Sequence, residues 1–202
     1  MTNDETDETR VEWLNPADGH EGDLVDRLTD LVNAVYATAE SGLWADGATR
    51  TTASELIALI STRQIAIAVQ DGRLVGSVQI HDVAPDVSEF GMLVAAPERR
   101  GTGIGRTLLT FAEQDGRARG LRAMQLELLL PRTWQHPNKE FLKAWYHRCG
   151  YRAVRTTRMD DAYPHLAPYL ATECDLVVYE KALQPARPAG THNSVSTATV
   201  AG

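Results

Sequence analysis

Apolar residues recur every three or four positions in several stretches of the chain, which is the period of a helix with one buried face. In the first stretch, Leu24, Leu28 and Leu31 lie on one stripe. The second stretch opens with Thr52 and Glu55, which are spaced as in a capping box. The helices predicted in this way span residues 23–37, 52–60, 103–119 and 138–149.

Strands are predicted where short runs of Ile, Val and Leu are bounded by turn residues. Asp71-Gly72 is a hairpin signal between two such runs. The run at 123–130 is mostly apolar, which is typical of a central strand. The predicted strands span residues 11–14, 64–70, 73–81, 88–94, 123–130, 151–156 and 175–181.

The predicted order of elements is β-α-α-β-β-β-α-β-α-β-β. The strand-helix-strand unit in the second half implies one parallel pair, and the hairpins imply antiparallel neighbours. We therefore expect an α/β (α+β) fold, in which a mixed, mostly antiparallel central sheet carries helices on both faces. A single domain is expected over residues 11–183, with disordered tails at 1–10 and 184–202 that have almost nothing to bury.

Composition narrows the class of protein mainly by exclusion. The 202 residues are 43% hydrophobic and 23% charged, as in a soluble globular protein. No apolar run approaches the roughly 18 residues of a membrane helix. The net charge of −7 argues against general nucleic-acid binding, which needs a basic face. Residues 1–10 do not resemble a targeting signal, and Cys149 and Cys174 form no framework, so a reducing cytoplasm is expected.

Residues 99–106 place three glycines and three arginines between a predicted strand and a predicted helix. Glycines let the backbone approach a ligand closely, and free N–H groups at a helix start attract an anion. The segment lacks the lysine of a nucleotide triphosphatase loop, and position 106 lacks the glycine of a dinucleotide fingerprint. It therefore predicts a site for another phosphorylated ligand. The alternative is a glycine-rich helix start that binds nothing.

The spacing of Arg100, Gly103 and Gly105 satisfies the pattern Arg/Gln-x-x-Gly-x-Gly/Ala. The segment 89–109 around them resembles the acyl-CoA-binding motif of the GNAT N-acetyltransferases. The strand order resembles that of the family as well, over roughly residues 11–182. The resemblance implies a fold of the class expected above and acetyl-CoA as co-substrate, with no metal.

A second segment, 141–151, resembles the later helix of this family, which typically ends with an aromatic residue followed by Tyr-x-x-x-Gly-Phe/Tyr. Tyr146, Gly150 and Tyr151 fall on this pattern. The family often has an asparagine seven residues before the tyrosine, where this chain has Lys139.

The residues around this departure are also interpreted from their own spacing. Asn138, one position before Lys139, is a candidate helix N-cap. Phe141, Leu142 and Trp145 are expected to form the buried stripe of the helix.

The resemblance also implies how the coenzyme is held. The glycine-rich turn is expected to bind the pyrophosphate, and the strand edge at 92–94 is expected to pair with the pantetheine arm. A strand N–H near a bulge, that of Leu93 or Val94, would stabilise the oxyanion. The expected coenzyme-binding residues are Met92, Leu93, Val94, Arg99, Arg100, Gly101, Thr102, Gly103, Ile104, Gly105 and Arg106.

Acetylation of an amine needs a base for the amine and an acid for the leaving thiolate. By resemblance Tyr146 is the acid, and its alternative role is that of a buried aromatic. Glu89 is the candidate base, since it lies eleven residues before Arg100, as in the histone-acetylating branch of the family; the alternative is an ordinary exposed strand residue. Glu127 is its rival and either pairs with an arginine or helps to hold the substrate. Water is a third route for the proton.

The acceptor is expected between two loops, residues 41–51 and 159–174, by resemblance to the family. The second loop mixes acids and aromatics that would suit a cationic amine, although a solvated loop is equally compatible. The three histidines His81, His147 and His165 share no metal spacing and are interpreted as surface residues.

The sequence therefore predicts an acetyl-CoA-dependent N-acetyltransferase. It would act on a primary amine of a small molecule or peptide by direct attack in a ternary complex, in a chain that forms a monomer or a homodimer. The alternatives are a transferase that uses a longer acyl-CoA and a non-catalytic acyl-CoA-binding module of the same fold.

Overall fold

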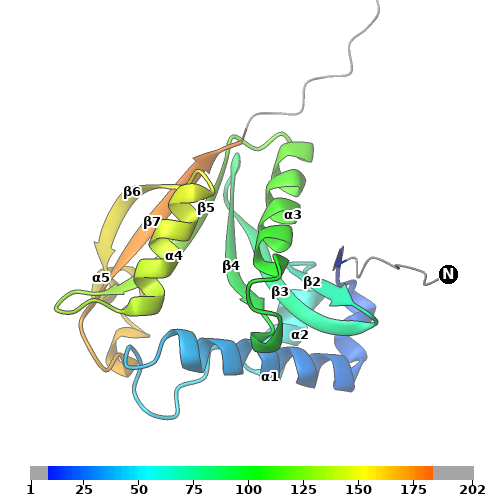
Figure 1. Ribbon diagram of the computed structural model, residues 1–202, viewed down its shortest axis with the longest axis horizontal. Helices are drawn as coiled ribbons and strands as arrows, with labels where there is room; N and C mark the ends of the chain where they lie inside the picture. Colours follow the sequence, from blue (N-terminus) through cyan, green and yellow to red (C-terminus); the bar gives the residue numbers. More distant parts are fainter. Residues whose placement is uncertain (1–8, 184–202) are drawn as a thin grey trace, which may run out of the picture.

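The computed structural model describes residues 9–183, and a seven-stranded sheet runs through it in the order β1-β2-β3-β4-β5-β7-β6 (Figure 1). Only the pairing of β4 with β5 is parallel. This confirms the mixed, mostly antiparallel sheet that the sequence predicts. The strands are β1 (Arg10–Trp13), β2 (Ile65–Gln70), β3 (Arg73–Ala84), β4 (Val87–Ala95), β5 (Ala123–Pro131), β6 (Arg152–Arg158) and β7 (Cys174–Ala182). The predicted tail at 184–202 and residues 1–8 of the other tail lie outside the described residues.

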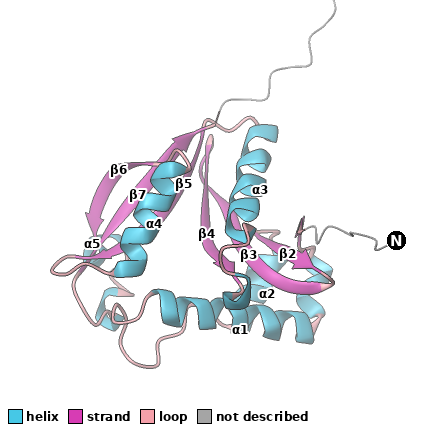
Figure 2. Cartoon of the chain, viewed as in Figure 1, coloured by secondary structure: helices cyan, strands magenta, loops and turns pink. Residues whose placement is uncertain are grey.

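Helices cover both faces of the sheet, as expected (Figure 2). Two of them, α3 and α4, enclose the larger core with side chains such as Phe90, Leu108 and Leu126. The other two long helices, α1 and α2, enclose a second core around Leu28, Ile67 and the buried side chains of β4. The helices are α1 (Gly22–Ala39), α2 (Ala53–Ser61), α3 (Ile104–Ala118), α4 (Pro137–Arg148) and the short α5 (Met159–Ala162). None of the helices between residues 9 and 183 combines the length and apolar character that a bilayer crossing requires.

The parallel pairing of β4 with β5 is short, so the two strands are separate over most of their length. The two strands share only three register pairs, Val87 with Ala123, Ser88 with Met124, and Glu89 with Gln125. Beyond them the strands diverge toward α1, as Figure 1 shows. The described part of the chain therefore gives the β5-facing edge of β4 after Glu89 no strand partner.

Capping and turn residues set the ends of several helices and strands, as predicted. Thr52 caps α2 by accepting a hydrogen bond from the Glu55 backbone N–H at 3.2 Å, and the Glu55 carboxylate accepts one from the Thr52 N–H at 2.8 Å. Asp71 and Gly72 both have positive φ, as a tight hairpin requires. Gly150 also has positive φ immediately after α4, because a residue without a Cβ adopts this conformation most easily.

The prediction for α4 is wrong in two respects. His136, not Asn138, is the N-cap, because Pro137 occupies the first helical position and the His136 ring accepts from the Asn138 N–H at 3.2 Å. Phe141 is 52% exposed, and the residues of α4 that are buried are Lys139 and Tyr146. The apolar stripe is thus only partly the packed face, and a buried charge replaces the expected phenylalanine.

Gly76 on β3 lets the start of α3 approach the sheet. A Cβ at this position would lie 2.7 Å from the Val94 carbonyl oxygen and 2.9 Å from Cγ2 of Ile104. Because one contact is backbone, we expect Gly76→Ala to lower the free energy of unfolding by about 1–3 kcal/mol. Urea denaturation measures this. Gly22→Ala is the control, since a Cβ there meets nothing within 4 Å; equal effects of the two changes would contradict the packing argument.

Candidate active site

A β-bulge interrupts β4 beside the point where β4 leaves β5. Gln79 pairs with Gly91 but Ser77 pairs with Val94, so three steps along β4 oppose two along β3. Met92, inside the bulge, has φ +43°, an uncommon conformation for a residue with a side chain. Strained backbone of this kind is concentrated at functional sites. The bulge lies where the oxyanion donor, Leu93 or Val94, is expected.

The side chains of residues 92–94 all pack against the hydrophobic core. Met92 and Val94 are buried in the core under α1 and α2, and Leu93 packs against the core on the opposite face. A ligand in the gap between β4 and β5 would therefore meet the backbone of residues 92–94 along this strand edge.

The glycine-rich turn forms an open cradle of backbone N–H groups. Gly101 and Gly103 have φ of +85° and +96°, and Gly103 is the N-cap of α3. A Cβ on either of them, or on Gly105, would meet nothing within 4 Å. No backbone hydrogen bond within residues 9–183 uses the N–H groups of Gly101, Gly103, Ile104, Gly105 and Arg106. Together with the positive end of α3, these donors suit a phosphate group.

The arginines add positive charge around the cradle. Arg100 and Arg106 are exposed, and Arg99 is half-buried with its guanidinium 3.9 Å from Asp71. The Thr102 hydroxyl donates to the Arg99 carbonyl at 2.7 Å and so holds the turn in shape. The Ile104 side chain is buried in the core, so this predicted binding residue contributes its N–H alone.

Tyr146 enters the site from α4. Its ring contacts those of Phe90, Trp145 and Tyr151, with centroid distances of 5.9, 4.9 and 6.1 Å. Its hydroxyl makes no hydrogen bond within the described residues. Burial raises the pKa of this hydroxyl far above the usual value, so it keeps its proton at neutral pH. The ring fills the core while the hydroxyl stays a proton donor, and the two roles considered from sequence are compatible.

Glu89 lies on the opposite face of the sheet from Tyr146, with a carboxylate that is largely enclosed. Gln125 Nε2 donates to it at 2.7 Å, and His81 Nε2 lies 3.9 Å away. Burial raises the pKa of the Glu89 carboxyl, the hydrogen bond from Gln125 opposes the shift, and the charge of Glu127 reinforces it. Glu89 is therefore not a fully exposed strand residue, and its raised pKa makes it a stronger base than an exposed carboxylate.

Glu127 is paired, but with a tyrosine and not with an arginine. The hydroxyl of Tyr163, from the loop after α5, donates to the Glu127 carboxylate at 2.6 Å. Burial and this carboxylate raise the pKa of Tyr163, which therefore remains a donor. Glu127 and Glu89 face the same side of the sheet, because Gln125 and Glu127 are two residues apart on β5.

His81 was interpreted as a surface residue, and the structure corrects this. It pairs with Glu89 across β3 and β4, and its Nδ1 is enclosed with no hydrogen-bond partner among the described residues. Burial lowers its pKa, which favours the neutral ring. His147 and His165 are exposed as predicted. In the described part of the chain, no three His, Cys, Asp or Glu side chains gather in a metal-binding arrangement.

Tyr36 of α1 completes the site and was not predicted from the sequence. Its ring packs against the core cluster that contains Met92 of the bulge, and the Arg50 guanidinium carbon lies 5.1 Å from the ring centroid. Burial raises the pKa of the Tyr36 hydroxyl, while Arg50 and the Met92 backbone oppose the shift. The only sequence signal is its position at the end of the first helix, before the loop expected to contact the acceptor.

The two loops predicted to hold the acceptor, residues 41–51 and 159–174, are joined by backbone hydrogen bonds. We call the surface they form together the acceptor wall. The Ala45 N–H donates to the Tyr169 carbonyl at 2.8 Å, and the Ala171 N–H donates to the Leu43 carbonyl at 2.9 Å. Of the acids and aromatics in the second loop, Tyr163 reaches the carboxylates of the sheet. Asp160 instead pairs with exposed Arg158.

A buried ion pair holds this wall to α4. The Lys139 ammonium and the Glu40 carboxylate are 4% and 10% exposed and in direct contact, and the Trp44 indole N–H donates to the same carboxylate at 2.6 Å. Asn138 Nδ2 donates to the Ala39 carbonyl at 3.1 Å. Lys139 therefore serves the end of α1, at the position where the resemblance leads us to expect an asparagine.

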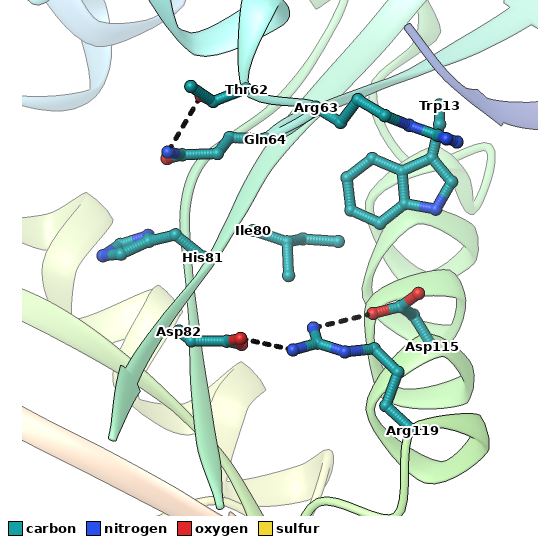
Figure 3. Close-up of a pocket in the computed structure, with 9 residues that line it drawn as sticks. All are labelled: Trp13, Thr62, Arg63, Gln64, Ile80, His81, Asp82, Asp115 and Arg119. Carbon is teal, nitrogen blue, oxygen red and sulfur yellow. Dashed lines mark hydrogen bonds and ion pairs between the residues drawn. The ribbon is translucent and has the colours of Figure 1, made fainter. Parts of the chain in front are cut away.

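A separate hollow of about 400 Å³ opens at the edge of β3, where this strand extends beyond β2 (Figure 3). Arg119 crosses it to contact Asp82 and Asp115, and the Gln64 amide contacts Thr62. Its charged groups are thus largely paired with one another, and neither Glu89 nor Tyr146 lines it. We place the reaction at the β4–β5 gap.

Comparison with known proteins identifies the family of the chain. Residues 30–151 match the model of the acetyltransferase (GNAT) family. No curated protein sequence matches the chain.

Several solved structures share the fold. PaiA N-acetyltransferase from Thermoplasma acidophilum, in complex with coenzyme A, is 17% identical with a TM-score of 0.63, over 87% of this chain and 99% of that one. Ribosomal-protein-alanine N-acetyltransferase from Brucella melitensis is 18% identical with a TM-score of 0.62, over 86% and 99%. YncA from Salmonella typhimurium, with its cofactor acetyl-CoA, is 14% identical with a TM-score of 0.60, over 89% and 96%.

Removal of the Lys139 ammonium tests the buried ion pair. Lys139→Met leaves the Glu40 carboxylate buried without its counter-charge, so we expect a loss of about 3–5 kcal/mol in the free energy of unfolding. Lys143→Met is the matched control on the same helix, since its pair with Glu140 is 37% and 43% exposed and is expected to contribute less than about 1 kcal/mol. Chemical denaturation of both variants gives the comparison. Similar losses would show that the buried pair contributes no more than the exposed one.

The pH dependence of stability tests the environment of Glu89. Because burial raises the pKa of the folded carboxyl, its favourable contribution is present below the unfolded pKa and is lost as pH rises through the folded pKa. Glu89→Gln does not ionise. We therefore expect the stability of this variant, relative to the parent protein, to increase as pH is raised from 4 toward 8. A difference that stays constant or decreases over this range would contradict the assignment.

Proposed function

The chain belongs to the GNAT acetyltransferase family, and from this premise we propose that it transfers the acetyl group of acetyl-CoA to a primary amine. The acceptor is a small molecule or peptide, and it attacks directly in a ternary complex. One observation carries the proposal. At the point where β4 leaves β5, the free edge of β4 begins, the Glu89 carboxylate meets Gln125, and the Tyr146 ring contacts the neighbouring Phe90.

The residues of the glycine-rich turn fit acetyl-CoA. The free N–H groups of Gly101 and of residues 103–106, together with the exposed side chains of Arg100 and Arg106, suit the pyrophosphate. The edge of residues 92–94 offers backbone groups to the pantetheine arm, which carries amides of its own. Solved structures that share the fold contain coenzyme A or acetyl-CoA, which supports this choice of ligand.

Acetyl-CoA supplies an activated acetyl group as a thioester, and the chain supplies the proton transfers. Glu89 accepts a proton from the ammonium form of the acceptor, directly or through water. The amine nitrogen then forms a bond to the carbonyl carbon, and the carbon–sulfur bond breaks. The N–H of Leu93 or Val94 stabilises the negative charge on the carbonyl oxygen. Tyr146 gives its proton to the departing thiolate, and the second proton of the amine, released as the amide forms, passes through water and restores the tyrosine.

The cysteines support transfer without an acyl-enzyme. A covalent route needs a thiolate within reach of the thioester. Cys149 and Cys174 are both buried. Burial raises the pKa of the Cys149 thiol and raises that of Cys174 to about 11. Both therefore stay protonated at neutral pH, so the amine itself is the nucleophile we propose.

Thiol release from acetyl-CoA in the presence of an amine panel tests the proposal. We expect amine-dependent turnover, and we expect Tyr146→Phe to lower kcat at least about tenfold because the donor to the thiolate is lost. The dissociation constant of acetyl-CoA should change little. Tyr151→Phe is the matched control, because its ring belongs to the same cluster while its hydroxyl donates to Glu113 at 3.2 Å.

Each outcome has a distinct meaning. Unchanged kcat in Tyr146→Phe would remove this hydroxyl from the reaction. Acetyl-CoA binding without thiol release for any amine would instead favour a non-catalytic acyl-CoA-binding module.

A further inference from the structure

Arg50 lies in the loop between α1 and α2, where its backbone is held in place. The Asn33 side-chain oxygen accepts hydrogen bonds from the N–H groups of Arg50 and Thr51 at 2.9 and 3.1 Å. The Asn33 amide donates to the Thr51 carbonyl at 3.0 Å. The capped start of α2 follows at once. Arg50 is therefore an exposed residue on a fixed support.

Its side chain points toward the site already described. The guanidinium carbon lies 5.1 Å from the centroid of the Tyr36 ring, in a cation–π contact. Tyr36 in turn packs against the core cluster that contains Met92 of the β4 bulge. One side chain therefore separates Arg50 from the backbone where we place the acetyl group.

The guanidinium has donors to spare. Within residues 9–183, no carboxylate lies within 4.0 Å of it. Two carboxylates beyond this distance, those of Glu40 and Glu55, attract the Arg50 charge but already have hydrogen-bond partners. Glu40 is held by Lys139 and Trp44, and Glu55 accepts from the Thr52 N–H. A guanidinium carries five N–H donors in a planar fork, and a carboxylate is the group that matches this fork best.

Opposite charges therefore border one site. Tyr163 connects them, because its hydroxyl donates to Glu127 while its titration is affected by the charges of both Glu89 and Arg50. The carboxylates at one end favour an ammonium group, and the guanidinium at the other favours an anion. A polycation would meet repulsion at Arg50, whereas a zwitterion would be complementary to both ends.

We infer that Arg50 binds a carboxylate of the acceptor, so that the acceptor is an amino acid or another amine that carries a carboxylate. This inference rests on the proposed function, since it names the substrate class of the same site. Arg50 takes no part in proton transfer and instead determines specificity and holds the acceptor in position.

Matched acceptor pairs test the inference. The probes are lysine against cadaverine, leucine against leucinamide, and β-alanine against ethanolamine and phosphoethanolamine. We expect the carboxylate-bearing member to have the higher kcat/KM, by at least about tenfold for a charged hydrogen-bonded contact. Arg50→Gln should raise KM for that member at least about tenfold, leave kcat within about twofold, and remove the preference. Arg50→Lys should restore part of it, because the charge returns without the fork.

Arg27→Gln is the control, an exposed arginine of α1 whose side chain contacts the Asp23 carbonyl; it should behave as the parent protein. A preference for amides or decarboxylated amines, or one that survives in Arg50→Gln, would overturn the inference. So would a raised KM for acetyl-CoA in place of the acceptor effect, which would assign Arg50 to the coenzyme. A preference for phosphoethanolamine would overturn the carboxylate assignment. Failure of the proposed function looks different, since no amine would then release thiol.

Discussion

The early end of the β4–β5 ladder is the constraint on which the rest of the site depends. Backbone N–H and C=O groups need partners, and a strand inside a sheet normally finds them on both sides. After Glu89, β4 finds strand partners within residues 9–183 only toward β3. The vacant edge lies between α3 and α4, and the bulge at Met92 alters the direction of its groups at the same point. A molecule with amides and a carbonyl can take the place of the absent strand there.

The acceptor wall depends on a different interaction, the buried pair of Lys139 and Glu40. The two residues are 99 positions apart, and their contact fixes the end of α1 against the first turn of α4. The loop from α1 to α2 then pairs with the loop before β7. The helix that carries Tyr146 is thus tied to the loops predicted to hold the acceptor, so the proposed proton donor and the proposed acceptor site share one support.

Sequence patterns predicted those parts of the protein that depend on neighbouring residues. The hairpin at Asp71-Gly72, the capping box of α2 and the glycine-rich turn are encoded by local turn chemistry. The burial of Lys139 in place of Phe141 was missed, because the partner that makes it possible comes from α1. Tyr36 was missed for a similar reason, and the bulge was expected only from the resemblance to the family, since helix docking and strand register are set by contacts across the fold.

Successive side chains of β4 point to opposite faces of the sheet. The gap between β4 and β5 therefore bears on the proposed proton transfers as well as on coenzyme binding. Phe90 faces α4 and touches the Tyr146 ring, while its neighbour Glu89 faces the other side and meets Gln125. An acid on one face and a base on the other could not act on one molecule across a continuous sheet. Where β4 leaves β5, the sheet is interrupted and no longer separates its two faces. In the proposed reaction, Tyr146 then protonates the thiolate from the α4 side while the acceptor loses its proton on the side of Glu89, as direct transfer requires.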